Sequence, residues 1–587
     1  MKNMINNKLF YKLLLVQIMI AAMGSINSLI DGIIAGRFID AMTVGVIGLF
    51  FPIVFIMNAI SAVISGGSAV LSGRYIGSGD LKKTNGIFSL SIAITVLVSF
   101  FLVAAAVFFP GLIARFCGAE DSLIQPLKLY ILGNAIGFLP QLLSQQLASF
   151  LQLERQSQRN YIGIATMIVS NVTFNILFVV VFKMGVFGLA LSTSMCNWLY
   201  LLVLLPYYFQ KNSQLKFSTG NIFWEKLGEL LKIGIPGAFI LFCLSLREPV
   251  LNRIVIRYAG PDGISAKAAL SMIGGIFTSV CLGAGAVVRM LSSIYRGEED
   301  RDSLKSLLKL CYTKIMILAL VTAGFMMLVS GLIAEWYFPD RSSEVYKLAY
   351  DYFILYAVAT PFIMIVQIEN NYLQAMGHNI CVNVISFMDG FANVVCLAFL
   401  LAPLFGVIGI WWATPLGSLL SSLIYPIYAI ICKRGIPANA NEWMILEKDF
   451  GSEDNDRLIM LLSDMTEVTE TAEKVQSFCS SHGLSKKTAM YSALCLEEMT
   501  RNVVEFGFED NKRKYYLNSR IVYKKGEVLL RIKDDCKAFD PVDMYKRLNA
   551  EDPAMNIGIK MVMRIAEDVS YQNFLGLNVL TIGLKEA

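Results

Sequence analysis

The chain has 587 residues, of which 56% are hydrophobic and 16% are charged, and its formal net charge is +5. A polypeptide this apolar is not an ordinary water-soluble globule, so most of it is expected to lie in a lipid bilayer. Two histidines, and cysteines without a CxxC pair, leave almost no ligands for a zinc or haem centre.

The charged residues divide the chain into two regions. Residues 1–435 contain 30 Lys and Arg against 20 Asp and Glu, whereas residues 436–587 contain 20 against 25, which gives net charges of +10 and −5. This rise in charge density is expected where a membrane-embedded region is followed by a soluble one. We predict a membrane domain over residues 1–435, a linker over 436–455 and a soluble domain over 456–587.

Twelve apolar runs of roughly 20 residues, the length that crosses a bilayer, occur in the first region. They begin near residues 13, 44, 86, 127, 160, 186, 233, 265, 310, 350, 380 and 405. Basic residues gather in alternate short loops, for example Lys82, Lys83, Lys232 and Lys433. That side is expected to be cytoplasmic, which predicts an all-α, multi-pass protein of the plasma membrane with both termini in the cytoplasm.

The membrane region also contains an internal repeat. "SFLQLERQSQRN" (149–160) is similar to "NYLQAMGHNI" (371–380), and "GVFGLALST" (185–193) to "GVIGIWWAT" (406–414), at an offset of about 221 residues. The repeat predicts two six-helix halves, residues 1–215 and 216–435, in the same orientation. Secondary transporters with alternating access are built in this way and bind their substrate between the halves near the bilayer midplane.

Ionisable residues inside the predicted spans are candidate transport residues, because charge is costly there. Asp31 lies in the first span, Glu248 in the seventh and Glu369 in the tenth. Each carboxylate could load and release a proton, as a proton-coupled exporter requires. For Glu248, a static ion pair with Arg247 or Arg253 is an equal alternative. Asp31 is therefore the favoured coupling residue.

Several segments together resemble the multidrug and toxic compound extrusion (MATE) transporters. They include "NSLIDGIIAGRF", "GGSAVLSGRYIGSGD" and "MGVFGLALST" in the first half and "LNRIVIRYAGPDGISA" and "YLQAMGH" in the second. The resemblance implies a twelve-helix exporter that exchanges organic, often cationic, substrates for H⁺ or Na⁺. It matches Asp31 to the first-helix Asp, Asn175 to the fifth-helix Asn and Glu248 to a seventh-helix Glu of some members. The Asp that often follows that Asn is absent here, which leaves the coupling ion open.

The soluble region reads as mixed α and β structure. Residues 466–482 and 486–507 have the periodicity of amphipathic helices, and residues 516–535 that of a hairpin about Lys525-Gly526. A helix over 556–569 and strands over 571–584 are expected to follow. This order predicts an α/β sandwich.

The order of these elements resembles the histidine-kinase-like ATPase fold, and most closely the anti-sigma-factor serine kinases. "EEMTRN" matches their asparagine box, which implies that Asn502 holds Mg²⁺ against the phosphates of ATP and that Glu498 is the catalytic residue, as a general base or water activator. "KDDCKAFDP" implies that Asp534 accepts the adenine amino group, and "NIGIKMV" keeps Gly558 beside the phosphates. Glycines usual in the family are replaced here by Cys536, Ala538 and Asn556, which is expected to narrow the pocket.

The leading interpretation is an ion-coupled antiporter that exports organic, cationic compounds and carries a cytoplasmic ATP-binding regulatory domain. No P-loop motif is present in the sequence that would indicate an ATP-driven motor. A membrane-anchored serine kinase or sensor acting on a cytoplasmic regulatory protein is one alternative, in which the tail is the enzyme. A flippase for lipid-linked precursors, with Arg247 and Arg253 in its cavity, is the other. No nucleic-acid partner is expected.

Overall fold

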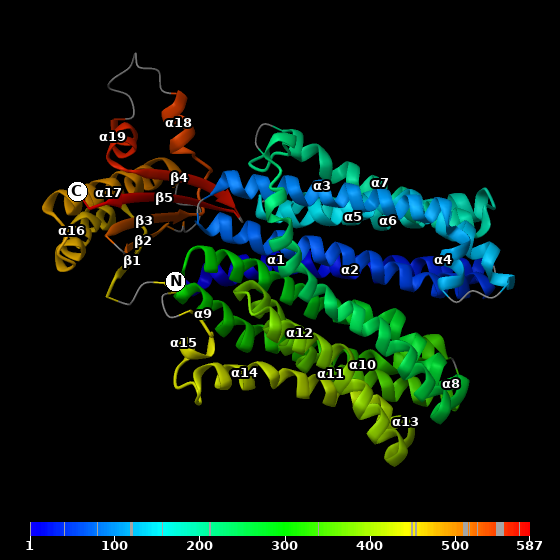
Figure 1. Ribbon diagram of the computed structural model, residues 1–587. Coiled ribbons are helices and arrows are strands. Elements are labelled where there is room, and N and C mark those ends of the chain that lie inside the picture. The colour runs from blue at the N-terminus through cyan, green and yellow to red at the C-terminus, as the bar shows by residue number, and fades with distance from the viewer. Residues whose placement is uncertain are drawn as a thin grey trace.

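The computed structural model describes most of the chain. The described residues are 2–39, 41–78, 80–117, 121–154, 156–210, 213–338, 340–447, 450–451, 455–508, 515, 517–524, 526–547, 557–574 and 576–586. Asn556, which the sequence places in the phosphate loop, and Lys525, at the predicted hairpin turn, lie outside them. A helical membrane domain and a C-terminal domain with one β-sheet are visible side by side in Figure 1.

The membrane domain is built from long helices. Those of the first half are α1 (Lys2–Phe38), α2 (Ala41–Ser78), α3 (Leu81–Phe108), α4 (Pro110–Phe116), α5 (Asp121–Leu153), α6 (Ser157–Asn175), the π-helical turn η1 (Ile176–Val181) and α7 (Gly185–Leu204). Those of the second are α8 (Leu227–Gly297), α9 (Arg301–Leu310), the π-helical turn η5 (Cys311–Ile315), α10 (Met316–Tyr337), α11 (Glu344–Met376), α12 (Asn379–Phe387), the π-helical turn η6 (Met388–Ala392), α13 (Asn393–Ser422) and α14 (Ile424–Lys433). Within the described residues, nine helices are long and apolar enough to cross a membrane, or ten when one bent pair counts as a span.

Glycines divide the longest helices and make the repeat visible in the backbone. Gly260 in α8 and Gly406 in α13 have positive φ of 57° and 60°, so each of these elements is two helices joined at a break. Gly185, which is equivalent to Gly406 in the repeat, has a φ of 58°. Glycine is the residue that adopts this conformation without a steric penalty. The two equivalent segments of the repeat therefore begin with the same backbone conformation.

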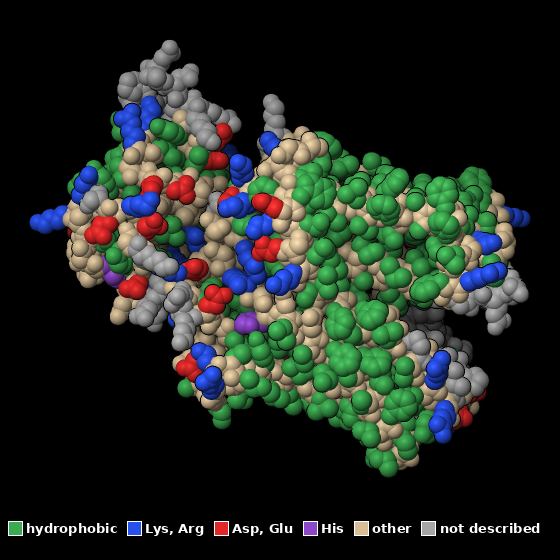
Figure 2. Space-filling model, viewed as in Figure 1, with side chains coloured by type: hydrophobic (Ala, Val, Ile, Leu, Met, Phe, Trp, Pro, Cys, Tyr) green, Lys and Arg blue, Asp and Glu red, His purple; other side chains and the backbone are tan. Residues whose placement is uncertain are grey.

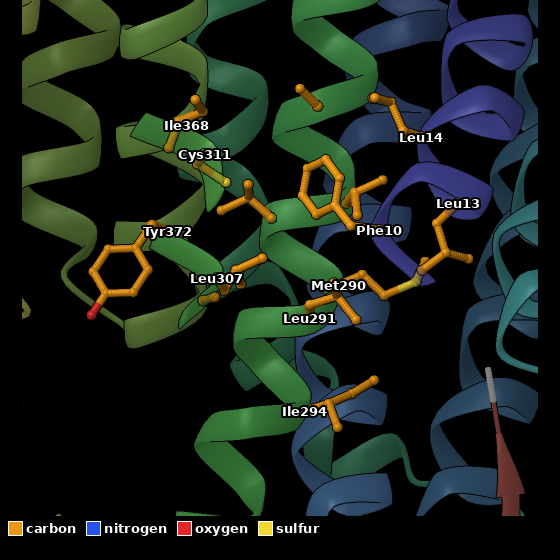
Figure 3. Packing of buried hydrophobic residues seen from close by; sticks show 14 of the residues in the cluster. Phe10, Leu13, Leu14, Met290, Leu291, Ile294, Leu307, Cys311, Ile368 and Tyr372 are labelled. Atoms are coloured by element: carbon orange, nitrogen blue, oxygen red, sulfur yellow. The ribbon is translucent and has the colours of Figure 1, made fainter. Parts of the chain in front are cut away.

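The two halves meet most closely at the end of the bundle that carries the C-terminal domain, hereafter the tail-side end (Figure 1). A continuous cluster of buried side chains joins α1, α8, α9 and α11 there. In Figure 3, Met290 of α8 lies beside Phe10 and Leu13 of α1, and Ile294 follows further along α8. Figure 2 shows apolar side chains covering the outside of the helices, while charged side chains gather at the tail-side end and, in smaller number, at the opposite end. This distribution is that of a membrane-spanning bundle.

The C-terminal domain packs helices on one antiparallel sheet of order β1-β2-β3-β5-β4. Its strands are β1 (Arg457–Leu462), β2 (Leu517–Lys524), β3 (Glu527–Asp534), β4 (Asp568–Phe574) and β5 (Leu577–Lys585), and its helices are α16 (Met465–Ser481), α17 (Lys486–Gly507), α18 (Pro541–Arg547) and α19 (Ile557–Ile565). Strand β1 is an addition to the predicted elements. The helix predicted to reach residue 569 ends at Ile565, because Asp568 already pairs with Gly583 of β5.

The segment between the two domains packs against the membrane domain where it is described. It contains the short helix α15 (Ala440–Trp443), followed by the buried residues Met444 and Ile445. Tyr372 of α11 donates a hydrogen bond of 2.8 Å to the Met444 carbonyl. Arg301 of α9 donates one of 2.6 Å to the Phe450 carbonyl. These contacts dock the segment on the tail-side end.

Candidate functional site

Asp31 of α1 lies at the centre of a buried polar network in the first half. Its Oδ1 accepts hydrogen bonds from Asn175 Nδ2 at 2.8 Å and from Asn171 Nδ2 at 3.2 Å, and its Oδ2 accepts one from Thr193 Oγ1 at 2.9 Å. Asn175 in turn accepts a hydrogen bond of 2.5 Å from Ser192. The side chain of Asp31 is 4% exposed. A buried carboxylate surrounded by neutral donors can change its charge without breaking an ion pair.

Three helices supply this network, and their local sequences explain how. Asn171 and Asn175 are four residues apart on α6, so their side chains lie on one face. The turn that follows Asn175, η1, is π-helical, and such turns are frequent at functional sites. Sequence reasoning selected Asp31 and Asn175 but missed Asn171, Ser192 and Thr193. The sequence features that could have identified them are the four-residue spacing of Asn171 and Asn175 and the two hydroxyl residues that end the repeat segment "GVFGLALST".

Glu248, the candidate of the second half, lies in an ion-pair cluster. Lys267 Nζ is 2.5 Å from Glu248 Oε2, and Arg247 Nη2 is 3.3 Å from Glu248 Oε1. Lys267 also donates a hydrogen bond of 2.6 Å to Asn252 Oδ1. The sequence anticipated Arg247 or Arg253 as partners and missed Lys267, which lies beyond the break at Gly260. The cluster gives Glu248 the static pairing that was the alternative to a coupling role.

Glu369 lies in a third place, near the tail-side end of α11. Its Oε1 accepts a hydrogen bond of 3.3 Å from Tyr312 Oη, and its side chain is buried. Tyr312 belongs to the π-helical turn η5. In the part of the chain that the structure describes, no hydrogen bond or ion pair joins Asp31 to Glu248 or to Glu369. The candidate carboxylates therefore form three separate clusters.

Glu498 and Asn502 lie one turn apart on α17, both half-buried, in the C-terminal domain. The side chain of Glu498 covers the start of α19, because a Cβ built on Gly558 would lie 2.0 Å from Glu498 Oε1. At the C-terminal end of α17, a Cβ on Gly507 would lie 3.0 Å from the Cβ of Cys536. The asparagine box, the start of α19 and the acidic turn after β3 are thus brought together.

Asp534, at the end of β3, is held by its neighbours. Its Oδ1 accepts hydrogen bonds from Asn578 Nδ2 of β5 at 2.6 Å and from the Cys536 N–H at 2.9 Å. Burial raises the pKa of this carboxyl above its ordinary value. The sequence did not identify Asn578 as a partner of Asp534, because Asn578 lies in the last strand, 44 residues further along the chain. A carboxylate has about four acceptor positions, so Asp534 keeps capacity for one further donor.

The residues present fit a nucleotide. Gly558 has no side chain, which leaves room for that of Glu498 between α17 and α19, and the N–H groups at a helix N-terminus such as that of α19 bind phosphate. Cys536, one of the glycine replacements, is buried against Asp534, whereas Ala538 is exposed.

Comparison with known proteins assigns both domains. The MatE family model matches residues 18–181 and 236–395, which together are more than half of the chain. The model described as a histidine kinase-like ATPase domain matches residues 461–583. These matches agree with the two resemblances found in the sequence.

Curated relatives align with the membrane domain. A probable multidrug resistance protein, YoeA, of Bacillus subtilis (strain 168) is 22% identical over 424 residues, which is 70% of this chain and 90% of YoeA. The multidrug export protein MepA of Staphylococcus aureus (strain bovine RF122 / ET3-1) is 22% identical over 434 residues, which is 71% of this chain and 93% of MepA.

Solved structures show the same fold. A multidrug resistance MATE family transporter of the MOP superfamily, in an outward-facing conformation, superposes with a TM-score of 0.66 at 16% identity over 71% of this chain and 94% of that one. A MOP superfamily transporter from Pyrococcus furiosus, reported to have a binding pocket of reversed polarity, gives a TM-score of 0.65 at 16% identity over the same shares.

Proposed function

This chain belongs to the MatE family, and from that premise we propose that it is an H⁺- or Na⁺-coupled antiporter that exports organic, cationic compounds across the plasma membrane. The observation that carries the proposal is the Asp31 network, a buried carboxylate that three neutral side chains hold in the first half of the bundle. Such a site can bind a cation from one side of the membrane and release it to the other. Asp31 and Asn175 are the coupling residues in this proposal.

Glu248 has a structural role in the proposal. Its ion pair with Lys267 fixes the first part of α8 to the part after the break at Gly260, and Arg247 adds a second cationic partner from the first part. The same pairs weigh against a flippase for lipid-linked precursors, because Arg247, one of its cationic cavity residues, is already paired. Glu369 is kept as a second ion-binding candidate, since its carboxylate has only the hydroxyl of Tyr312 as a hydrogen-bond partner among the described residues.

The C-terminal domain is proposed to be a cytoplasmic ATP-binding module that regulates export. The positive side chains that gather at the tail-side end support a cytoplasmic position for this domain and for both termini. Asp534 would receive the adenine amino group, Asn502 would hold Mg²⁺ against the phosphates, and Gly558 would let α19 approach them. Bound ATP would supply a transferable phosphoryl group, and Glu498 would act as the base that takes the proton of the attacking nucleophile.

The experiment compares wild type with Asp31→Asn in inverted membrane vesicles that take up the cationic dye ethidium. Imposed H⁺ and Na⁺ gradients are tested separately. We expect uptake driven by one of these gradients in the wild type and none in Asp31→Asn, with equal amounts of inserted protein. Asp262→Asn, an exposed acid of α8 outside the network, is the matched control and should transport normally. Full transport by Asp31→Asn, or uptake that requires ATP and no gradient, would contradict the proposal.

A further inference from the structure

The face of the C-terminal sheet that points away from its helices is cationic. It carries Arg520 on β2 and Arg531 and Lys533 on β3. Arg520 and Arg531 are direct partners in the antiparallel register, and both are buried, at 6% and 5% exposure. Like charges directly opposite one another destabilise a sheet. Such a pair therefore needs a partner of opposite charge outside the sheet.

That partner is the acidic segment, residues 298–300, which follows α8 in the second half of the membrane domain. Lys533 Nζ is 2.5 Å from Glu298 Oε2, and Arg520 Nη1 is 3.4 Å from Asp300 Oδ2. Arg520 Nη2 also donates a hydrogen bond of 3.3 Å to the Glu299 carbonyl. The side chains of both ion pairs are at most 15% exposed, so the contact is a desolvated interface rather than a surface attraction.

Arg531 extends this interface to the first half. Its Nη1 donates a hydrogen bond of 3.2 Å to the Glu298 carbonyl, and its Nη2 donates one of 3.2 Å to the carbonyl of Gly77, in the last turn of α2. A single guanidinium thus joins the ends of two helices that belong to opposite halves. Arginine suits this position, because its planar group presents several donors in a fixed fork.

The two helix ends that Arg531 joins are in contact along their backbones. We call this contact the seam: residues 73–77 of α2 against residues 293–297 of α8. A Cβ on Gly77 would lie 2.3 Å from the Ile294 carbonyl oxygen, and one on Gly297 would lie 2.2 Å from the Arg74 carbonyl oxygen. Ser293 is fully buried there. The seam is therefore closed in this structure, and a path to the tail side requires α2 and α8 to separate.

We propose that the C-terminal domain is a clamp that holds the seam closed, with Arg531 bridging the two halves and the acidic segment anchoring the sheet. Opening the seam separates Gly77 from Glu298, so Arg531 can keep at most one of its two backbone partners. The domain thereby favours the state in which the tail side is shut. The inference rests on the proposed function, because alternating access is what makes the seam open.

The test measures how often the seam opens in the full-length chain. Ser293→Cys introduces a thiol that a maleimide reaches only when α2 and α8 separate, and its alkylation is followed by peptide mass spectrometry in membranes without an ion gradient. Exposed Cys432 provides an internal reference for reagent delivery. We expect Arg531→Ala to accelerate alkylation by about tenfold, the effect of about 1.4 kcal/mol lost from the closed state.

Control variants separate a released clamp from a damaged domain. Lys474→Ala removes a cation from an exposed pair on α16 and should leave alkylation unchanged. Lys533→Glu should accelerate it, and Glu298→Lys combined with Lys533→Glu should restore the slow rate. Unchanged alkylation in Arg531→Ala, or no restoration by the double exchange, overturns the clamp. Ethidium transport by the same membranes tests the proposed function separately. If the membranes do not transport ethidium but Arg531→Ala is alkylated faster, the proposed export is refuted and the clamp is not. If they transport ethidium but alkylation is unchanged in Arg531→Ala, the clamp is refuted and export is not.

Discussion

Replacing Gly77 by alanine should force α2 and α8 apart at the seam. The new Cβ would lie 2.3 Å from the Ile294 carbonyl oxygen and 2.8 Å from the Glu298 backbone nitrogen. Ordinary contacts begin at 3.4 Å, so α2 and α8 must move apart by about 1.1 Å, the difference between 3.4 and 2.3 Å. Both obstructing atoms belong to the backbone, which cannot rotate away as a side chain does.

The cost of this displacement falls on the closed state. Overpacking a close contact costs about 1–3 kcal/mol, which corresponds to a change of roughly 5-fold to 150-fold in an equilibrium constant. The shift also moves the Gly77 carbonyl relative to Arg531, which weakens the clamp. We therefore expect Gly77→Ala to populate the open seam and to accelerate alkylation of the thiol introduced by Ser293→Cys by a factor in this range.

The control is Gly24→Ala, because a Cβ at Gly24 of α1 meets no atom within 4 Å. Gly297→Ala should reproduce the effect from the other side of the seam, since its Cβ would lie 2.2 Å from the Arg74 carbonyl oxygen. If both seam variants are alkylated as slowly as the wild type and Gly24→Ala, the seam is not the barrier on the tail side.

Two further predictions concern the charged clusters. Lys267→Met should lower the free energy of unfolding by about 1–3 kcal/mol, because Glu248 loses a charged hydrogen-bond partner. In a thermal melt, adding Glu248→Gln to the same chain should recover most of this loss. Equal melting temperatures of the single and double variants would contradict the pairing. At Asp300, burial acts to raise the pKa, but Arg520 and Lys533 outweigh it and hold the pKa well below its ordinary value. A depressed pKa means that the carboxylate stabilises the fold fully above the unfolded pKa near 3.9, and that this stabilisation is lost as the pH falls from there through the folded pKa. At pH 7, the seam thiol should therefore be alkylated more slowly in the wild type than in Asp300→Asn. The difference between the two rates should shrink below about pH 4.

The sequence was most informative where the signal was local or repeated. Apolar runs located the helices, and the segments beginning at Gly185 and Gly406 predicted two equivalent halves whose breaks the backbone shows. The Asp31 to Asn175 contact joins residues 144 positions apart, and only the resemblance to a family singled out both of them. A residue whose partner lies across a helix break, such as Lys267, carried no comparable signal.

The interface between the domains could not be predicted for a physical reason. The acidic segment "EED" at 298–300 and the basic positions on β2 and β3 each read as solvent-exposed charge when taken alone. Only the three-dimensional arrangement removes both from water and sets them against each other. The alternation along β3 did indicate that Arg531 and Lys533 share one face of the strand, since the residues of the other face are apolar.

Strand β3 brings the proposed nucleotide site and the clamp within three residues of each other. Val528, Leu530 and Ile532 point into the domain core, and Asp534 continues this face toward the asparagine box. Arg531 and Lys533 point to the opposite face, where Arg531 bridges the seam and Lys533 pairs with the acidic segment. ATP can move the seam only by as much as its affinity differs between the closed and open states. Because such coupling is reciprocal, any effect of ATP on seam opening requires an equal effect of seam opening on ATP affinity. The ATP occupancy of the C-terminal domain would therefore depend on the conformation of the membrane domain as much as it controls that conformation.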